Sequence, residues 1–188
     1  MRWFWIDQFI EFESGRRAVA VKNVSLAEDH IHEHFPGTPV MPNSLVLEGI
    51  AQTGGLLVGQ YGDFLERVIL AKVSRAKFHS HAQPGDTLYY TTEIHDIRDY
   101  GAMVVGTSHR VTPGKEKKEL QAEVELFFAH LNDTMNQELF DPANFLTMLR
   151  FLKLFDVARH PDGTKISVPA HLAQAERVAN ESASLTRR

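Results

Sequence analysis

The sequence predicts an α+β fold in which one antiparallel sheet wraps around a single long buried helix, followed by a helical C-terminal extension. Three observations lead to this prediction. Residues 45–58 are apolar on nearly every face of a helix, which is typical of a helix that is buried all round. Five or six strand-like segments follow this helix along the chain. After residue 132 the strand-like alternation stops and a helical pattern follows.

The first elements form a predicted hairpin. Residues 9–13 alternate between apolar and polar side chains, and residues 17–24 resume the strand pattern after a Ser14-Gly15 turn. We expect the three aromatic residues before this hairpin to pack in the core or at an interface; they are Trp3, Phe4 and Trp5.

Residues 34–42 must form a fixed loop, because they contain three prolines and a glycine. Pro42 marks the last point before the helix, and Asn43 or Ser44 is the expected N-cap. Gly62 is the expected C-terminal cap. Two further glycines, at 54 and 55, make sense if a strand or an acyl chain passes close to the helix backbone.

The rest of the sheet follows the helix. Turns are expected at Gln83–Asp86 and Pro113–Lys115. Strands are expected at residues 67–73, 75–79, 88–98, 101–112 and 119–131.

The chain divides into a main domain, residues 1–132, and an extension, residues 133–188. Asp141 and Pro142 are suited to open a helix over residues 145–155. Its many apolar residues favour packing on the core over docking of a carrier protein. A short helix is expected over residues 170–179, and residues 181–188 are expected to be loose.

Composition narrows the function classes. The chain has 188 residues, a net charge of −4 and no cysteine. The absence of cysteine excludes disulfides and thiolate metal sites. The negative net charge does not indicate a surface that binds nucleic acid. The helix is too short and too interrupted to span a membrane. The first residues do not resemble a secretion signal, so we expect a cytoplasmic protein.

Three alternating histidines invite a metal-site interpretation. His30, His32 and His34 would share one face of a strand. No later set of His and Asp residues completes a site at a convincing spacing, so we expect no metal and solvent exposure of His30 and His32.

Glu48 is the unusual residue of the apolar helix. It lies about one turn inside the helix, where the helix dipole favours the carboxylate and burial opposes it. One interpretation is a charge that reaches solvent at the helix end. The other is a catalytic carboxyl, with His34 of the preceding loop as its acid–base partner.

Residues 34–55 resemble the signature of the 3-hydroxyacyl-[acyl-carrier-protein] dehydratases of dissociated fatty acid synthesis. The shared pattern is a His-Phe-Pro-Gly loop, then Pro-Val-Met-Pro, then a helix with an acidic residue followed by Ala-Gln and Gly. The resemblance extends over residues 3–131, including Lys77-Phe78, the Pro84-Gly85-Asp86 turn and the strand at 122–129.

This resemblance implies a hotdog fold and dehydration of (3R)-3-hydroxyacyl thioesters, carried by acyl carrier protein, without a cofactor. It assigns His34 as the base that removes the C2 proton and Glu48 as the acid that protonates the C3 hydroxyl. It also implies a homodimer in which these two residues come from different subunits, with a trimer of dimers as a further assembly in some relatives.

The thioester oxygen needs hydrogen-bond donors. Backbone N–H groups at the helix start are unpaired and carry partial positive charge. The resemblance places the family's donor at Asn43, where the family usually has glycine. The other expected substrate contacts are Gly37, Val40, Ser44 and Gln52.

Glu rather than Asp at position 48 resembles the dehydratase-only branch of the family. Two alternatives remain open: a hotdog acyl thioesterase, in which Glu48 activates water, and a non-catalytic acyl-binding protein.

Overall fold

The computed structural model describes residues 4–115, 117–131 and 141–185 of the chain. Its strands are β1 (Gln8–Glu13), β2 (Arg17–Asn23), β3 (Arg67–Phe78), β4 (Thr87–Arg98), β5 (Gly101–Val111), β6 (Glu119–Leu131) and β7 (Ala158–Arg159). Its helices are α1 (Asp29–Glu33), α2 (Asn43–Tyr61), α3 (Pro142–Phe151), α4 (Leu154–Val157) and α5 (Ala170–Leu185). The expected strands of the main domain are confirmed, and the two segments expected at 67–73 and 75–79 form the single strand β3.

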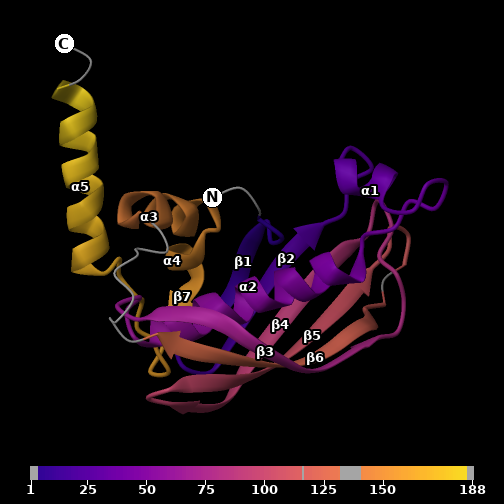
Figure 1. Ribbon diagram of the computed structural model, residues 1–188, viewed down its shortest axis with the longest axis horizontal. Helices are drawn as coiled ribbons and strands as arrows, with labels where there is room; N and C mark the ends of the chain where they lie inside the picture. The colour runs from indigo at the N-terminus through magenta and orange to yellow at the C-terminus, as the bar shows by residue number, and fades with distance from the viewer. Residues whose placement is uncertain (1–3, 116, 132–140, 186–188) are drawn as a thin grey trace.

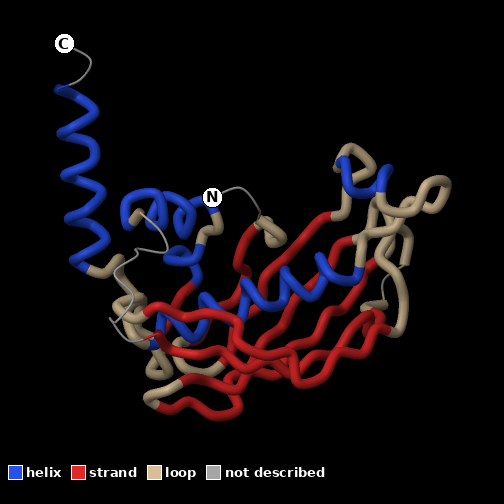
Figure 2. The backbone as a smooth tube through the Cα atoms, viewed as in Figure 1, coloured by secondary structure: helices blue, strands red, loops and turns tan. Residues whose placement is uncertain are grey.

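One seven-stranded sheet, in the order β3-β6-β5-β4-β2-β1-β7, curves around α2. All neighbouring strands are antiparallel except β1 and β7. The helix crosses the concave face of the sheet, as Figure 2 shows. The expected hotdog arrangement of a sheet wrapped around a central helix is therefore confirmed.

The core lies between α2 and the sheet. Val46, Ile50 and Leu57 of α2 are fully buried there, which explains why this helix has no polar face. A Cβ on Gly54 would lie 3.1 Å from Val104 of β5, and a Cβ on Gly55 would lie 3.2 Å from Phe128 of β6. The sequence suggested either a strand or an acyl chain close to these glycines. The structure places side chains of neighbouring strands against both of them.

The start of α2 differs from the predicted cap, and its end agrees with it. The helix begins at Asn43, so Pro42 takes the N-cap position, and no side chain of the described residues caps the helix. Gly62 is the C-cap residue as expected, with a φ of −97°. The next two residues, Asp63 and Phe64, have left-handed backbone conformations, with φ of 52° and 58°. A bulky residue is rare in that region, and this conformation turns the Phe64 side chain toward the extension.

The histidine segment is helical, so the predicted strand is wrong. His30 and His32 lie in α1, and His34 follows it as the C-cap. Residues two apart do not share a face of a helix, so the expected alternating face does not form. His32 is exposed as expected, but His30 is half-buried, with its ring edge-to-face against Trp5 at 5.0 Å between centroids.

β3 is the open edge of the sheet. It pairs with β6 on one side, and residues 70–77 are all exposed. Leu70 and Val73 keep 38% and 39% of their surface exposed, which is unusual for apolar residues in the middle of a strand.

The extension packs on the main domain. Asp141 caps α3 as expected, since its side chain accepts a hydrogen bond from the Asn144 backbone N–H at 2.8 Å. Leu146 and Leu149 of α3 are fully buried in the common core, which confirms the packing prediction. The predicted boundary between residues 132 and 133 falls outside the described residues.

Two features of the extension differ from expectation. β7 was not expected; it pairs in parallel with β1, joining Ala158 to Phe12. α5 continues to Leu185, so residues 181–185 are helical rather than loose. Within the described part of the chain, no helix has both the length and the apolar character needed to cross a bilayer.

Candidate active site

The proline-rich loop is held at both ends. The His34 backbone N–H donates to the carbonyl of His30, and Met41 N–H donates to Ala82 at 2.8 Å. Gly37 has a φ of +80°, which favours glycine, and no atom approaches within 4 Å of a Cβ built there. Residues 32–39 are exposed, whereas Val40 is buried beneath the loop. The loop therefore presents its outer part, including His34, at the surface of this chain.

Glu48 projects from the second turn of α2 and is half-buried, which is more exposure than its apolar neighbours predict. One of its carboxylate oxygens, Oε1, accepts a hydrogen bond from Nε2 of Gln52 at 3.0 Å. The two residues are one turn apart on the same helix, so the backbone of α2 fixes this contact.

The orientation of the Gln52 amide is determined by Trp5. The Trp5 backbone N–H can only donate, and it lies 3.0 Å from the Gln52 side-chain oxygen. The amide nitrogen of Gln52 must therefore face Glu48. The segment before β1 thus holds the carboxyl of α2 through one intervening amide.

The start of α2 supplies the predicted N–H donors. The N–H groups of Leu45 and Val46 already donate to the carbonyl of Pro42. Those of Asn43 and Ser44 precede them and have no carbonyl within the helix to bond. Ser44 is exposed, and the Oδ1 atom of Asn43 is buried with no hydrogen-bond partner among the described residues.

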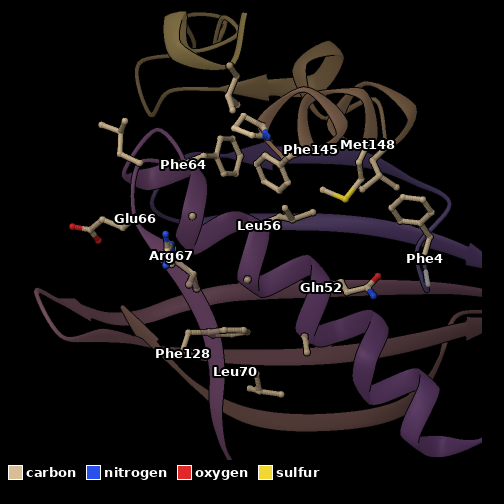
Figure 3. Close-up of a pocket in the computed structure, with 18 of the residues that line it drawn as sticks. Phe4, Gln52, Leu56, Phe64, Glu66, Arg67, Leu70, Phe128, Phe145 and Met148 are labelled. Atoms are coloured by element: carbon tan, nitrogen blue, oxygen red, sulfur yellow. The ribbon is translucent and has the colours of Figure 1, made fainter. Parts of the chain in front are cut away.

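A largely apolar groove of about 530 Å³ begins at Glu48 and Gln52 and runs between α2 and the extension (Figure 3). Phe4, Leu56, Phe64, Phe128, Phe145 and Met148 are among the residues that line it. Its volume is in the range of small-molecule sites. Its walls come from segments far apart in the chain, so the pattern of residues along the sequence does not locate it.

The structure brings together only some of the expected site residues. Glu48 and Gln52 are in contact and line the groove. His34 is exposed, and its ring packs edge-to-face on Phe35 at 4.3 Å between centroids. Among the described residues of this single chain, no hydrogen bond or ion pair joins His34 to Glu48.

The neighbouring His30 has a shifted pKa. Burial lowers the pKa of His30 below its ordinary value of 6.5, and nearby Glu28 opposes this effect. Burial also raises the pKa of Tyr90, whose hydroxyl faces the core. In the described residues, no three histidine, aspartate or glutamate side chains are grouped as metal ligands would be.

Comparison with known proteins gives a family match over most of the chain. The model of the FabA-like domain matches residues 3–123. The 3-hydroxyacyl-[acyl-carrier-protein] dehydratase FabZ of Pelotomaculum thermopropionicum is 36% identical over 125 residues, which are 66% of this chain and 85% of that protein. The FabZ of Moorella thermoacetica is 38% identical over 130 residues, covering 66% of this chain and 83% of that protein.

Solved structures agree on the fold. The protein smu.793 from Streptococcus mutans, solved with bound acetyl CoA, superposes with a TM-score of 0.56 at 14% identity. The superposition covers 70% of this chain and 94% of that one. At this identity the likeness concerns the architecture alone.

Proposed function

The chain belongs to the FabA-like domain family, and from that membership we propose that it removes water from 3-hydroxyacyl thioesters to give trans-2-enoyl thioesters. The observation that carries this proposal is the similarity to dehydratases over nearly their whole length. Identities of 36% and 38% extend over 85% and 83% of the two FabZ proteins. Both His34 and Glu48 lie inside the matched residues 3–123.

The reaction needs a base, an acid and a donor for the thioester oxygen. His34 takes the proton from C2, because a neutral imidazole is a good base near pH 7. As the C2–C3 double bond forms, the C3–O bond breaks, and Glu48 gives its proton to the departing hydroxyl, which leaves as water. Proton exchange with solvent then returns both side chains to their starting forms.

The thioester oxygen gains negative charge when C2 loses its proton. The N–H groups of Asn43 and Ser44 at the start of α2 are placed to donate to it, aided by the helix dipole. Gly37 leaves open space in the loop for the substrate. Gln52 steadies Glu48, and Val40 supports the loop from beneath.

The proposal includes a homodimer with a shared site. His34 is exposed, and no hydrogen bond or ion pair among the described residues joins it to Glu48, which supports a pair completed by a second copy. The open strand β3, with exposed Leu70 and Val73, supports pairing of two copies at this edge. A trimer of such dimers remains an alternative assembly.

Carrier-protein thioesters are the substrates named for the relatives, so we extend the proposal to a carrier-linked acyl group in this protein. We also propose a cytoplasmic location, which suits a chain without cysteine and hence without disulfides.

One assay separates dehydration from thioester hydrolysis. The protein is supplied with 3-hydroxydecanoyl-pantetheine, and enoyl absorbance and free thiol are followed together. A dehydratase raises the enoyl absorbance and releases no thiol. Thiol release without enoyl product would establish a thioesterase, and binding without either product would establish an acyl-binding protein.

The two catalytic assignments are tested by His34→Ala and Glu48→Gln. Each should lose about a hundredfold or more in kcat, since general acid–base catalysis contributes about that much. His32→Ala and Glu33→Gln are matched controls, because both residues are exposed neighbours in α1. Wild-type turnover in either site variant would refute its assigned role.

Mixing the two inactive variants tests the shared site. After subunit exchange, a mixed dimer carries one intact pair of His34 and Glu48, so part of the activity should return. Verified exchange without any recovery would show that the pair does not come from two subunits.

A further inference from the structure

The groove follows one stripe of α2 away from Glu48. Glu48, Gln52, Leu56 and Gly59 all line it, and they recur at the spacing of one helix face. At 1.5 Å per residue, this stripe extends about 16 Å from the carboxyl. The groove therefore has the direction that the acyl tail of a thioester reacting at Glu48 would need.

The opposite wall belongs to the C-terminal extension. Phe145, Met148, Leu152 and Leu172 line the groove from that side. All four lie beyond residue 123, where the match to the family ends. This wall is consequently a feature of this chain that the family match does not include.

The extension is held firmly in place. Asp141 caps α3, and the carbonyl of Leu152 accepts a hydrogen bond from the backbone N–H of Phe9 at 2.8 Å. Leu152 is 3% exposed and Met148 is 5% exposed, so both are packed rather than free to swing.

An aromatic pair lies where the α2 stripe reaches Gly59. The rings of Phe64 and Phe145 meet edge-to-face at 5.3 Å between centroids. Phe64 reaches this position through its left-handed backbone, a conformation that bulky residues seldom adopt. Glu66 and Arg67 also line the groove, and Figure 3 shows them on the side of it away from Gln52, so the lining becomes charged past the aromatic pair.

We propose that α3 and α5 form the outer wall of the acyl site and that the Phe64–Phe145 pair sets the longest acyl chain accepted. The occupant is the aliphatic tail of the 3-hydroxyacyl thioester, with C3 at Glu48 and the chain end at the aromatic pair. This inference rests on the proposed dehydratase function, which it deepens by adding a length limit.

The test compares the full-length protein with two variants on 3-hydroxybutyryl-, 3-hydroxydecanoyl- and 3-hydroxypalmitoyl-pantetheine. Met148→Trp fills the groove and should lower the ratio of long-chain to short-chain kcat/KM by at least about tenfold, because each methylene left in water costs about fourfold. Phe145→Ala opens the end and should shift the preference toward the longest chain.

Phe151→Ala is the matched control for Phe145→Ala. Phe151 is in the same helix but is 72% exposed and does not line the groove, so its variant should keep the wild-type length preference. Circular dichroism and thermal unfolding establish that each variant is folded. An unchanged length preference in folded Met148→Trp and Phe145→Ala would overturn the inference.

A binding measurement separates this inference from the proposed function. Saturated decanoyl-pantetheine lacks the 3-hydroxyl and cannot be dehydrated, and its binding is measured by calorimetry. If wild type dehydrates the butyryl substrate but neither variant changes decanoyl binding or length preference, the inference fails and the function stands. If no substrate is dehydrated but Met148→Trp weakens decanoyl binding at least tenfold, the function fails and the groove assignment stands.

Discussion

The side-chain amide of Gln52 donates a hydrogen bond to the Glu48 carboxylate at 3.0 Å, and the Trp5 backbone holds that amide from its other side. The contact joins the segment before β1 to the second turn of α2. Gln52 is therefore a positioning residue, because it acts on the reaction through the carboxyl that it holds.

Gln52→Met should lower kcat by about tenfold, since it removes the hydrogen bond to the Glu48 carboxylate, worth about 1 kcal/mol or somewhat more, together with the bond accepted from Trp5 N–H. KM should change little, because the substituted side chain keeps its apolar volume beside the groove. Gln60→Met is the control: Gln60 is buried in the same helix but does not line the groove. Equal losses in both variants would point to general helix damage instead of positioning.

Gly49→Ala should lower the free energy of unfolding by about 1–3 kcal/mol, as overpacking of a core does. A Cβ there would lie 2.4 Å from Tyr90 Cε2 and 2.8 Å from the carbonyl oxygen of Trp5. Alanine favours helix by up to about 1 kcal/mol, which is too little to offset the clash. Unfolding by urea measures this loss. Gly62→Ala is the control and should leave the free energy of unfolding nearly unchanged, because a Cβ there meets nothing within 4 Å.

Asp141→Ala should destabilise α3 by about 1 kcal/mol, because it removes the N-cap bond to the Asn144 N–H. Hydrogen exchange of the α3 amides measures this effect locally, and faster exchange is expected there before any change in the sheet. Asp156→Ala, at an exposed site in α4, is the control. Unaltered exchange in α3 would show that the cap does not stabilise the extension.

Acidification should destabilise the fold through His30. Its pKa is lower in the folded state than the ordinary 6.5, chiefly because of burial. The unfolded chain therefore binds the proton more readily, and the stabilisation present above about pH 6.5 is lost as pH falls through the folded-state pKa.

The carboxylates of Glu119 and Glu123 have pKa values lowered from 4.5 by their bonds to Arg110 and His79, so their contribution is lost only at more acidic pH. As pH falls from about 6.5 through the folded-state pKa of His30, His30→Gln should flatten the dependence of unfolding free energy on pH. His32→Gln, at an exposed site of the same helix, should leave the dependence as in wild type.

Much of the main domain could be predicted from the sequence, because local patterns determine it. The alternation of apolar and polar residues located the strands, and the all-round apolar run located α2. The alternation of residue types gave a wrong prediction where tertiary packing determines the secondary structure. The alternating histidines suggested a strand, but Ile31 is buried at 1% exposure between them and the segment is helical.

The position of the groove could not be predicted, because Phe64 and Phe145 are 81 positions apart in the sequence and meet only in the folded chain. The left-handed conformation of Phe64 also has no local signal, since a bulky residue seldom adopts it. The pairing of His34 with Glu48 depends on a second copy and stays a prediction.

The extension also affects how copies of this protein can associate. Its residues 152–159 bond the outer side of β1, through Phe9 N–H to Leu152, Ser14 N–H to Arg159 and the β1–β7 pairing. Among the described residues, the margin of β3 is the one left to join another sheet. Two molecules that meet there occupy each other's free margin, so growth by strand addition stops at a pair and does not continue into a fibre.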